Sequence, residues 1–180
     1  MSRTKGKVLE SQAMFEGPLF SVRRERVVEP SGCEVTRDVV IHGGSVVLLP
    51  AFPDGKILLV RQYRHAAGCF LWELVAGGIE PGETPLQAAR RELIEETGYR
   101  ARRMQKLMDV FPTPGFLNEH MVVFACRDLK SGEAHPEEHE KLEVRLFSLR
   151  ELERMMLTGR LRDTKSIAAI LFYSRFLRRK

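Results

Sequence analysis

The stretch from Gly77 to Tyr99 constrains the fold of this chain more than any other, because it carries acidic side chains at regular spacing. Glu92, Glu95 and Glu96 lie at positions i, i+3 and i+4, so a helix would stack their carboxylates on one face. Three like charges on one face repel one another unless a cation compensates them. Hard oxygen ligands suit Mg²⁺, which keeps several waters and is often shared with substrate phosphates. The stretch therefore predicts a divalent-metal site for a phosphate-bearing ligand.

Local signals specify this helix at both ends. Thr84 and Gln87 form a capping-box pattern around Pro85, which suits the first helical position. Gly98 can adopt the left-handed conformation that ends a helix. We therefore expect a helix from about residue 85 to residue 97. Its apolar side chains recur at helical spacing and should face a core: Leu86, Ala89 and Leu93.

By itself, the acidic face also fits a solvated surface helix whose glutamates pair with Arg90 and Arg91. The longer pattern argues against that alternative: Gly77, then Glu83 after five residues, then the run Arg91–Tyr99 (RELIEETGY) after seven more. This pattern resembles the Nudix box, with every position filled. The resemblance implies a hydrolase of nucleoside diphosphates linked to another moiety, working with Mg²⁺ or Mn²⁺.

The same resemblance implies roles for individual residues of the box. Glu92 and Glu96 would bind the metal, with Glu95 close behind them. Arg91 would hold the carboxylates in place. The backbone carbonyl of Ala76, just before the box glycine, would complete the coordination.

Composition limits the class of protein. A chain of 180 residues is long enough to bury one core and too short for two. Its 43% hydrophobic and 29% charged residues are typical of a soluble globular domain. Neither a membrane-length apolar run nor a secretory signal is visible. The three cysteines are widely spaced and odd in number, which favours a reducing cytosol, so we expect a cytoplasmic protein. The net charge of +5 comes partly from a basic C-terminus without a nucleic-acid motif; we expect neither nucleic-acid nor membrane partners.

The order of the predicted elements favours an α/β fold. Two apolar runs, 46–52 and 56–62, flank Pro53-Asp54-Gly55 and indicate a hairpin. Further strands are expected at 71–76, 104–110, 121–125 and 142–147, and two more helices after Ser148 and Asp163. Residues 130–141 are polar and predict a surface loop. The resemblance implies the Nudix α/β/α sandwich with a mixed sheet at 43–180, preceded by a small antiparallel β unit at 1–42.

The surroundings of the box resemble one subfamily, the ADP-ribose pyrophosphatases. The matching segments are 61–64 (RQYR), 72–77 (WELVAG), 37–44 (RDVVIHGG), 138–144 (EHEKLEV) and Pro114, sixteen residues after Gly98. The resemblance covers roughly residue 20 to the C-terminus. One departure is Leu117, which lacks the hydroxyl group that many relatives have at this position of the loop.

Pyrophosphate hydrolysis needs a proton acceptor as well as a metal, because the metal lowers the pKa of a bound water and a carboxylate must take the proton. By position in the subfamily, Glu140 is the best match for this base and Glu138 the next. The alternative is that both belong to a solvated acidic loop.

Four further residues are candidates for substrate binding. Arg37 and Arg64 suit phosphate oxygens, and an ion pair is the alternative for each. Glu73 could hold a ribose hydroxyl or support the metal, or be a buried carboxylate paired with an arginine. Gly115, in the loop around Pro114, is expected to contact substrate.

The resulting hypothesis is a Mg²⁺-dependent hydrolase that cleaves ADP-ribose, or a close ADP-sugar, to AMP and a sugar phosphate. One alternative is a hydrolase of another nucleotide sugar, GDP-mannose or a UDP-sugar. A second is a non-catalytic Nudix domain that senses ADP-ribose. The resemblance also implies a homodimer formed through residues 1–42, since these are too short to bury a core alone.

Overall fold

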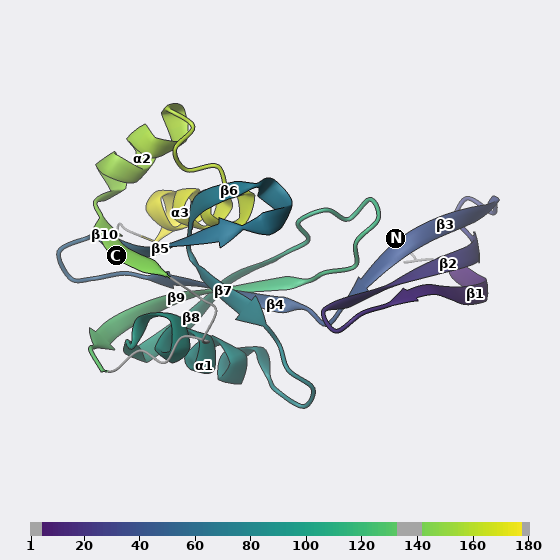
Figure 1. The fold of residues 1–180 in the computed structure, drawn as a ribbon, viewed down its shortest axis with the longest axis horizontal. Helices are drawn as coiled ribbons and strands as arrows, with labels where there is room; N and C mark the ends of the chain where they lie inside the picture. Colours follow the sequence, from purple (N-terminus) through teal and green to yellow (C-terminus); the bar gives the residue numbers. More distant parts are fainter. Residues whose placement is uncertain (1–4, 133–141, 178–180) are drawn as a thin grey trace. The chain divides into compact units, whose positions relative to one another are not determined.

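The computed structural model describes residues 5–132 and 142–177 (Figure 1). It divides into two compact units, which are described separately below. The first comprises Met1–Gly44 and Phe111–His120, and the second comprises Ser45–Val110 and Met121–Lys180. The boundary expected between residues 42 and 43 stays a prediction. No helix of the described part is both long and apolar enough to cross a membrane.

The first unit is an antiparallel sheet in the order β1 (Lys7–Glu16), β2 (Phe20–Val28), β3 (Glu34–His42). The segment 111–120 runs along the last strand: the Val40 N–H donates to the carbonyl of Phe116 (2.8 Å), and the Asn118 N–H donates to the carbonyl of Val40 (3.1 Å). The Asn118 side-chain oxygen then accepts from the His42 N–H at 2.7 Å. The loop around Pro114 is thus anchored to a strand about seventy positions earlier in the chain.

Two sheets form the second unit. One is mixed, in the order β7 (Val75–Gly78), β4 (Ser45–Pro50), β9 (Met121–Lys130), β8 (Arg100–Val110), with β4 and β9 parallel. The other is antiparallel, in the order β10 (Glu143–Phe147), β5 (Ile57–Arg64), β6 (Cys69–Glu73), with a short helical turn η1 (His65–Ala67) between β5 and β6. The helices are α1 (Pro85–Thr97), α2 (Leu149–Leu157) and α3 (Thr164–Phe176).

Strand β4 separates two hydrophobic clusters. Its residues are buried on both faces: Val46 and Leu48 pack with α1, and Val47 and Leu49 pack with the second sheet, α2 and α3. An uninterrupted apolar run is typical of a strand covered on both sides. Figure 1 shows α1 on one side of the mixed sheet and α2 and α3 on the other. The expected α/β/α arrangement with a mixed sheet is therefore confirmed.

Helix α1 confirms its predicted bounds and both caps. The Gln87 N–H donates to the Thr84 hydroxyl at 3.3 Å, and the Thr84 N–H donates to the Gln87 side chain at 2.8 Å. Gly98 has a φ of 71°, in the left-handed region. The expected core face was wrong at one position, because Leu86 is 37% exposed and Ala88 is buried instead.

The single strand expected at 71–76 is in fact two. Chain pairing changes at Leu74: β6 pairs with β5, whereas β7 pairs with β4 in the other sheet. The Leu74 N–H donates to the hydroxyl of Ser166 on α3 at 2.7 Å instead of to a neighbouring strand. This switch between sheets brings the chain from the α3 side of the unit to the start of the box loop.

Candidate active site

The box loop and α1 meet where Gly77 faces Glu92. A Cβ built on Gly77 would overlap the Glu92 carboxylate, whereas one built on Gly78 would meet nothing within 4 Å. The Glu92 carboxylate lies against the backbone of β7, in the space that a side chain at position 77 would fill, so glycine is required there. The spacing between the box glycine and the helix glutamate thus has a direct steric cause.

Arg91 connects the carboxylates of the box. Its Nη1 donates to Glu92 at 2.7 Å and to Glu95 at 3.0 Å. Its Nε and Nη2 form a two-point pair with Glu83, both at 3.0 Å, and Nη2 also donates to the carbonyl of Gly78 at 2.9 Å. These bonds, the pair with Glu83 foremost, raise the pKa of Arg91, and the same pair lowers the pKa of Glu83.

Glu83 had no assigned role in the sequence, although it occupies a position of the box pattern. Its contact with Arg91 spans a loop and two helical turns, so no local spacing rule would have found it. With Glu83 and the Gly78 carbonyl, Arg91 ties the loop before α1 to the helix. The guanidinium is thereby fixed, and with it the carboxylates that it holds.

The alternative of a solvated acidic face does not describe this helix. Glu96 is 7% exposed, and the Glu92 side chain is 13% exposed. Glu95 is half-exposed, at 39%. A charged carboxylate is buried only when it has charge or hydrogen-bond compensation. Glu92 and Glu96, the first and last of the three glutamates, are thus turned inward, and Glu92 lies against β7.

The chemistry of these donors fits a hard divalent cation. Glu92, Glu95 and Glu96 offer carboxylate oxygens from one helix, and Ala76 lies on β7 directly before Gly77. No group of three or more acidic, histidine or cysteine side chains in residues 5–132 and 142–177 is already arranged around one point for a metal. A cation would therefore draw on these carboxylates, of which Glu92 and Glu95 are also bonded to Arg91, and backbone or water oxygens would complete its shell.

A second charged cluster joins β5, β6 and α3. Arg64 forms a two-point pair with Glu73, both bonds at 2.8 Å, and Lys165 donates to Glu73 at 2.5 Å and to Asp163 at 2.9 Å. Glu73 is only 1% exposed. Burial alone raises the pKa of its carboxyl, but the bonds from Arg64 and Lys165 outweigh burial and leave that pKa below its ordinary value.

This cluster bears on two of the substrate candidates. Glu73 is itself a buried strand carboxylate paired with an arginine, which was one of the alternatives for it. A role in holding ribose stays a prediction. Arg64 uses Nε and Nη2 on Glu73, so it would present its remaining edge to a phosphate. Lys165 was not identified in the sequence. It lies 92 positions from its partner Glu73, and only the docking of α3 brings the two together.

The other candidates lie in the first unit or outside the described residues. Arg37 is half-exposed on β3 and pairs with Glu29 across the β2–β3 turn, so the ion pair weighed for it in the sequence is present. Gly115 lies in the 111–120 segment with open space where a side chain would begin. Glu138 and Glu140 lie outside the residues that the structure describes.

Known proteins match this chain over most of its length. The family model described as NUDIX domain matches residues 42–170. ADP-ribose pyrophosphatase of Mycobacterium tuberculosis (strain ATCC 25618 / H37Rv) is 37% identical over 92% of this chain and 81% of its own. ADP-ribose pyrophosphatase of Bacillus subtilis (strain 168) is 32% identical, over 96% and 94%. GDP-mannose pyrophosphatase of Yersinia enterocolitica serotype O:8 / biotype 1B (strain NCTC 13174 / 8081) is 30% identical, over 81% and 82%.

A solved structure agrees with the fold. The crystal structure of an ADP compounds hydrolase superposes with a TM-score of 0.83 and covers 98% of this chain and 96% of its own, at 21% sequence identity. At that identity the likeness concerns the fold. The family model matches a range, residues 42–170, that includes the box with its glycine, arginine and glutamates. The chain therefore belongs to the Nudix hydrolase family.

Proposed function

We propose that this enzyme hydrolyses the pyrophosphate of ADP-ribose, or of a close ADP-sugar, to AMP and a sugar phosphate, with Mg²⁺ as the metal and Mn²⁺ as a substitute. One observation carries the proposal: the carboxylate of Glu92 lies against Gly77, beside the inward-turned Glu96, in a chain whose ADP-ribose pyrophosphatase relatives match more than nine-tenths of its length. Hydrolysis of a nucleotide-sugar pyrophosphate is supported by the names of the pyrophosphatase relatives. The adenine and ribose parts follow from the names of those relatives.

In this proposal the residues of α1 hold the cation and position it. Glu92 and Glu96 are its carboxylate ligands, Glu95 supports them, and the Ala76 carbonyl adds a neutral oxygen. When bound, such a cation neutralises phosphate charge and lowers the pKa of a water. Arg91 donates hydrogen bonds to Glu92 and Glu95 and so holds these two carboxylates in position for the cation.

Hydrolysis of the pyrophosphate also needs a general base and side chains that bind the phosphate groups. We assign the base to Glu140, with Glu138 as the second choice, because a carboxylate must accept the proton of the attacking water. Arg64 and Arg37 would bind phosphate oxygens through guanidinium edges not used by Glu73 and Glu29. Gly115 would let the substrate approach the backbone of its loop closely.

A homodimer is part of the proposal. Every residue of β1 is exposed, and apolar side chains are exposed on the first unit: Val8, Leu9, Met14, Phe15, Leu19 and Phe20. A three-stranded sheet with exposed apolar side chains and no core of its own favours burial against a partner. A second copy of the chain is the partner that we propose. The three free cysteines support a reducing compartment, and we place the enzyme in the cytoplasm.

A substrate panel tests the proposal directly. Purified enzyme is assayed with ADP-ribose, ADP-glucose, GDP-mannose, UDP-glucose and diadenosine diphosphate, each with Mg²⁺ and with Mn²⁺, and products are separated by ion-exchange chromatography. The highest kcat/KM is expected for ADP-ribose with Mg²⁺, with AMP as a product. GDP-mannose is the second candidate, because of the relative of that name. A higher kcat/KM for GDP-mannose than for ADP-ribose would make GDP-mannose the proposed substrate. If none of the compounds is hydrolysed, the catalytic proposal is overturned.

A further inference from the structure

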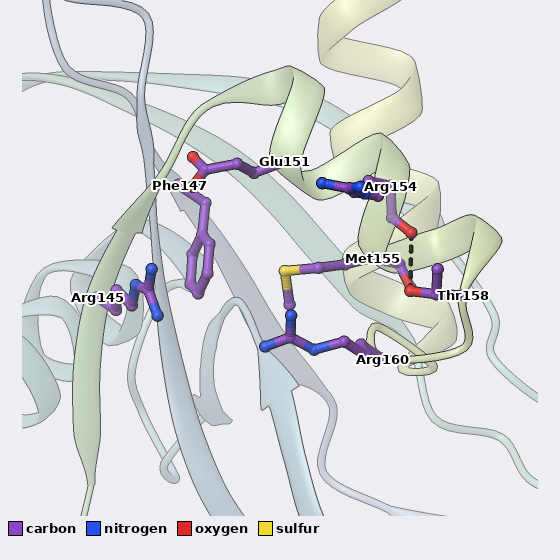
Figure 2. A pocket seen from close by; sticks show the side chains of 7 residues that line it. All are labelled: Arg145, Phe147, Glu151, Arg154, Met155, Thr158 and Arg160. Carbon is purple, nitrogen blue, oxygen red and sulfur yellow. Dashed lines mark hydrogen bonds between the residues drawn. The ribbon is translucent and has the colours of Figure 1, made fainter.

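A hollow of about 290 Å³ lies in the second unit between β10 and α2 (Figure 2). Figure 2 shows its side chains coming from the strand, from the helix and from the turn that follows the helix. None of them belongs to the box or to the Arg64–Glu73 cluster. The lining residues are Arg145, Phe147, Glu151, Arg154, Met155, Thr158 and Arg160.

Three guanidinium groups surround this hollow. Arg145 comes from β10, Arg154 from α2, and Arg160 from the turn after α2. In residues 5–132 and 142–177, none of the three lies within 4 Å of a carboxylate oxygen as an ion pair. Arg145 lies 4.9 Å from the centre of the Phe147 ring, and its charge helps to lower the pKa of Glu151, so one carboxylate faces three guanidinium groups here. Like charges around one space repel, and an anion would compensate them.

The helix dipole does not account for all three arginines. Basic side chains near a helix C-terminus are stabilised by the dipole, and this suffices for Arg154 and Arg160. Arg145 lies on a strand, on the opposite side of the hollow in Figure 2. Its position beside the same space favours a ligand over a helix-capping role.

The other lining groups add a polar and an apolar side. Glu151 uses one carboxylate oxygen to accept from the N–H of Ser148 (2.7 Å) and from its hydroxyl (2.8 Å), and these bonds lower the pKa of Glu151. The Thr158 hydroxyl donates to the carbonyl of Arg154 at 2.9 Å and can still accept. The floor is apolar, because Phe147 and Met155 are almost fully buried.

An ionised carboxylate among the arginines argues against a bare polyanion. Glu151 would repel such a ligand, but it can accept hydrogen bonds from hydroxyl groups. The volume is at the small end of ligand sites, which suits a compact metabolite rather than a dinucleotide. The ligand must therefore combine one strongly anionic group with several hydroxyls.

We infer that this hollow binds a small phosphorylated sugar, with its phosphate on the arginines and its hydroxyls on Glu151 and Thr158. It is a second ligand site, separate from the box. The inference stands on the hollow itself. It connects with the proposed function only because a sugar phosphate is also one product of that hydrolysis, so the second site would let the product influence the enzyme.

Calorimetric titration of the full chain with ribose 5-phosphate tests this inference, with ribose and inorganic phosphate as partial ligands. We expect saturable binding of ribose 5-phosphate, weaker binding of phosphate and none of ribose. Arg160→Gln should weaken ribose 5-phosphate binding by about tenfold or more, since a charge-assisted hydrogen bond is lost. Arg150→Gln, on the same helix but outside the hollow, is the matched control and should bind as the wild type does.

Binding at the box must be distinguished from binding at the hollow. Glu92→Gln should leave ribose 5-phosphate affinity unchanged, because it alters the box alone. If Arg160→Gln does not fold, Arg154→Gln replaces it, with circular dichroism checking each variant. The inference is overturned if ribose 5-phosphate does not bind, if phosphate alone binds as tightly, or if Glu92→Gln weakens binding while the arginine variants do not. The titration needs no turnover, so its outcome is independent of whether ADP-ribose is hydrolysed.

Discussion

At the residue scale, Arg91 shows how stacked carboxylates can persist on a folded helix. The i, i+3, i+4 pattern correctly indicated that three carboxylates share one side of α1. Their repulsion is offset by a guanidinium that donates to Glu92 and Glu95 and is itself fixed by Glu83. Spacing indicated that the three glutamates share a face, and the resemblance to the Nudix box implied the roles of Glu92 and Glu96, whereas the role of Glu83 required the folded loop. Spacing rules detect neighbours on one helix, and they do not detect partners across a turn.

Neutralising either inward-turned carboxylate should remove activity without unfolding the protein. Glu92→Gln and Glu96→Gln keep the side-chain shape but lose the charge that a cation needs, so kcat should fall by about two orders of magnitude or more. The metal-free protein should melt at the same or a slightly higher temperature, because the repulsion is reduced. Turnover is measured at saturating Mg²⁺ and melting by differential scanning calorimetry. A kcat close to that of the wild type for Glu96→Gln would contradict its assignment as a metal ligand.

The general base gives a second residue-scale prediction. Glu140→Gln should lower kcat by about two orders of magnitude and leave Mg²⁺ affinity nearly unchanged, because it removes a proton acceptor and not a ligand. Glu138→Gln serves as the neighbouring control and should have the smaller effect. Rapid-quench measurement of product formation over a Mg²⁺ series separates the two quantities. Full activity of Glu140→Gln together with loss in Glu138→Gln would move the base to Glu138.

At the element scale, α1 could be predicted and the β6–β7 break could not. Helix α1 carries its own start and stop signals in Thr84, Gln87 and Gly98, and these act locally. The run 71–76 is continuous in the sequence, so nothing local indicates that it changes sheets at Leu74. The break depends on the hydroxyl of Ser166, 92 positions away. Local patterns therefore predict elements, and long-range hydrogen bonds decide where an element is divided.

The packing of β7 against α1 predicts different outcomes for two adjacent glycines. Gly77→Ala should abolish most of the activity, because its Cβ would displace the Glu92 carboxylate. Gly78→Ala is the matched control: its Cβ meets nothing within 4 Å, so kcat should stay within about threefold of the wild type. Steady-state kinetics and melting temperatures of both variants test this contrast. Equal activity of the two variants would rule out the close approach of Glu92 to β7.

The junction of β5, β6 and α3 predicts a pH dependence of stability. The pKa of Glu73 is lower in the folded protein than in the unfolded chain, so its ion pairs stabilise the fold above about pH 4.3 and that stabilisation is lost as pH falls further. Glu73→Gln should unfold more easily at pH 7 and lose less stability between about pH 6 and pH 3. Glu153→Gln, an exposed glutamate of α2, is the control. Urea unfolding at several pH values measures both effects; parallel curves for Glu73→Gln and wild type would contradict the argument.

At the scale of the whole molecule, the two units differ in how much of each is buried. The second unit contains both hydrophobic clusters and the box, whereas the strands of the first unit contain no buried residue. Composition indicated one core, and the shortness of residues 1–42 indicated a β unit that needs a partner surface. The addition of 111–120 to β3 could not be foreseen, since it rests on backbone hydrogen bonds between distant segments.

Dimerisation is the prediction that belongs to the whole molecule. If a second copy covers the exposed apolar side chains of the first unit, light scattering should give about twice 20.6 kDa, and this mass should persist to nanomolar concentration, as expected for a large apolar interface. Deleting residues 1–36 should cost both the dimer and the activity. Phe15→Ser and Leu19→Ser, which leave the second unit intact, should weaken the dimer, whereas Lys56→Ser in the second unit should not. A fully active monomer of 20.6 kDa would show instead that the exposed sheet has no partner in catalysis.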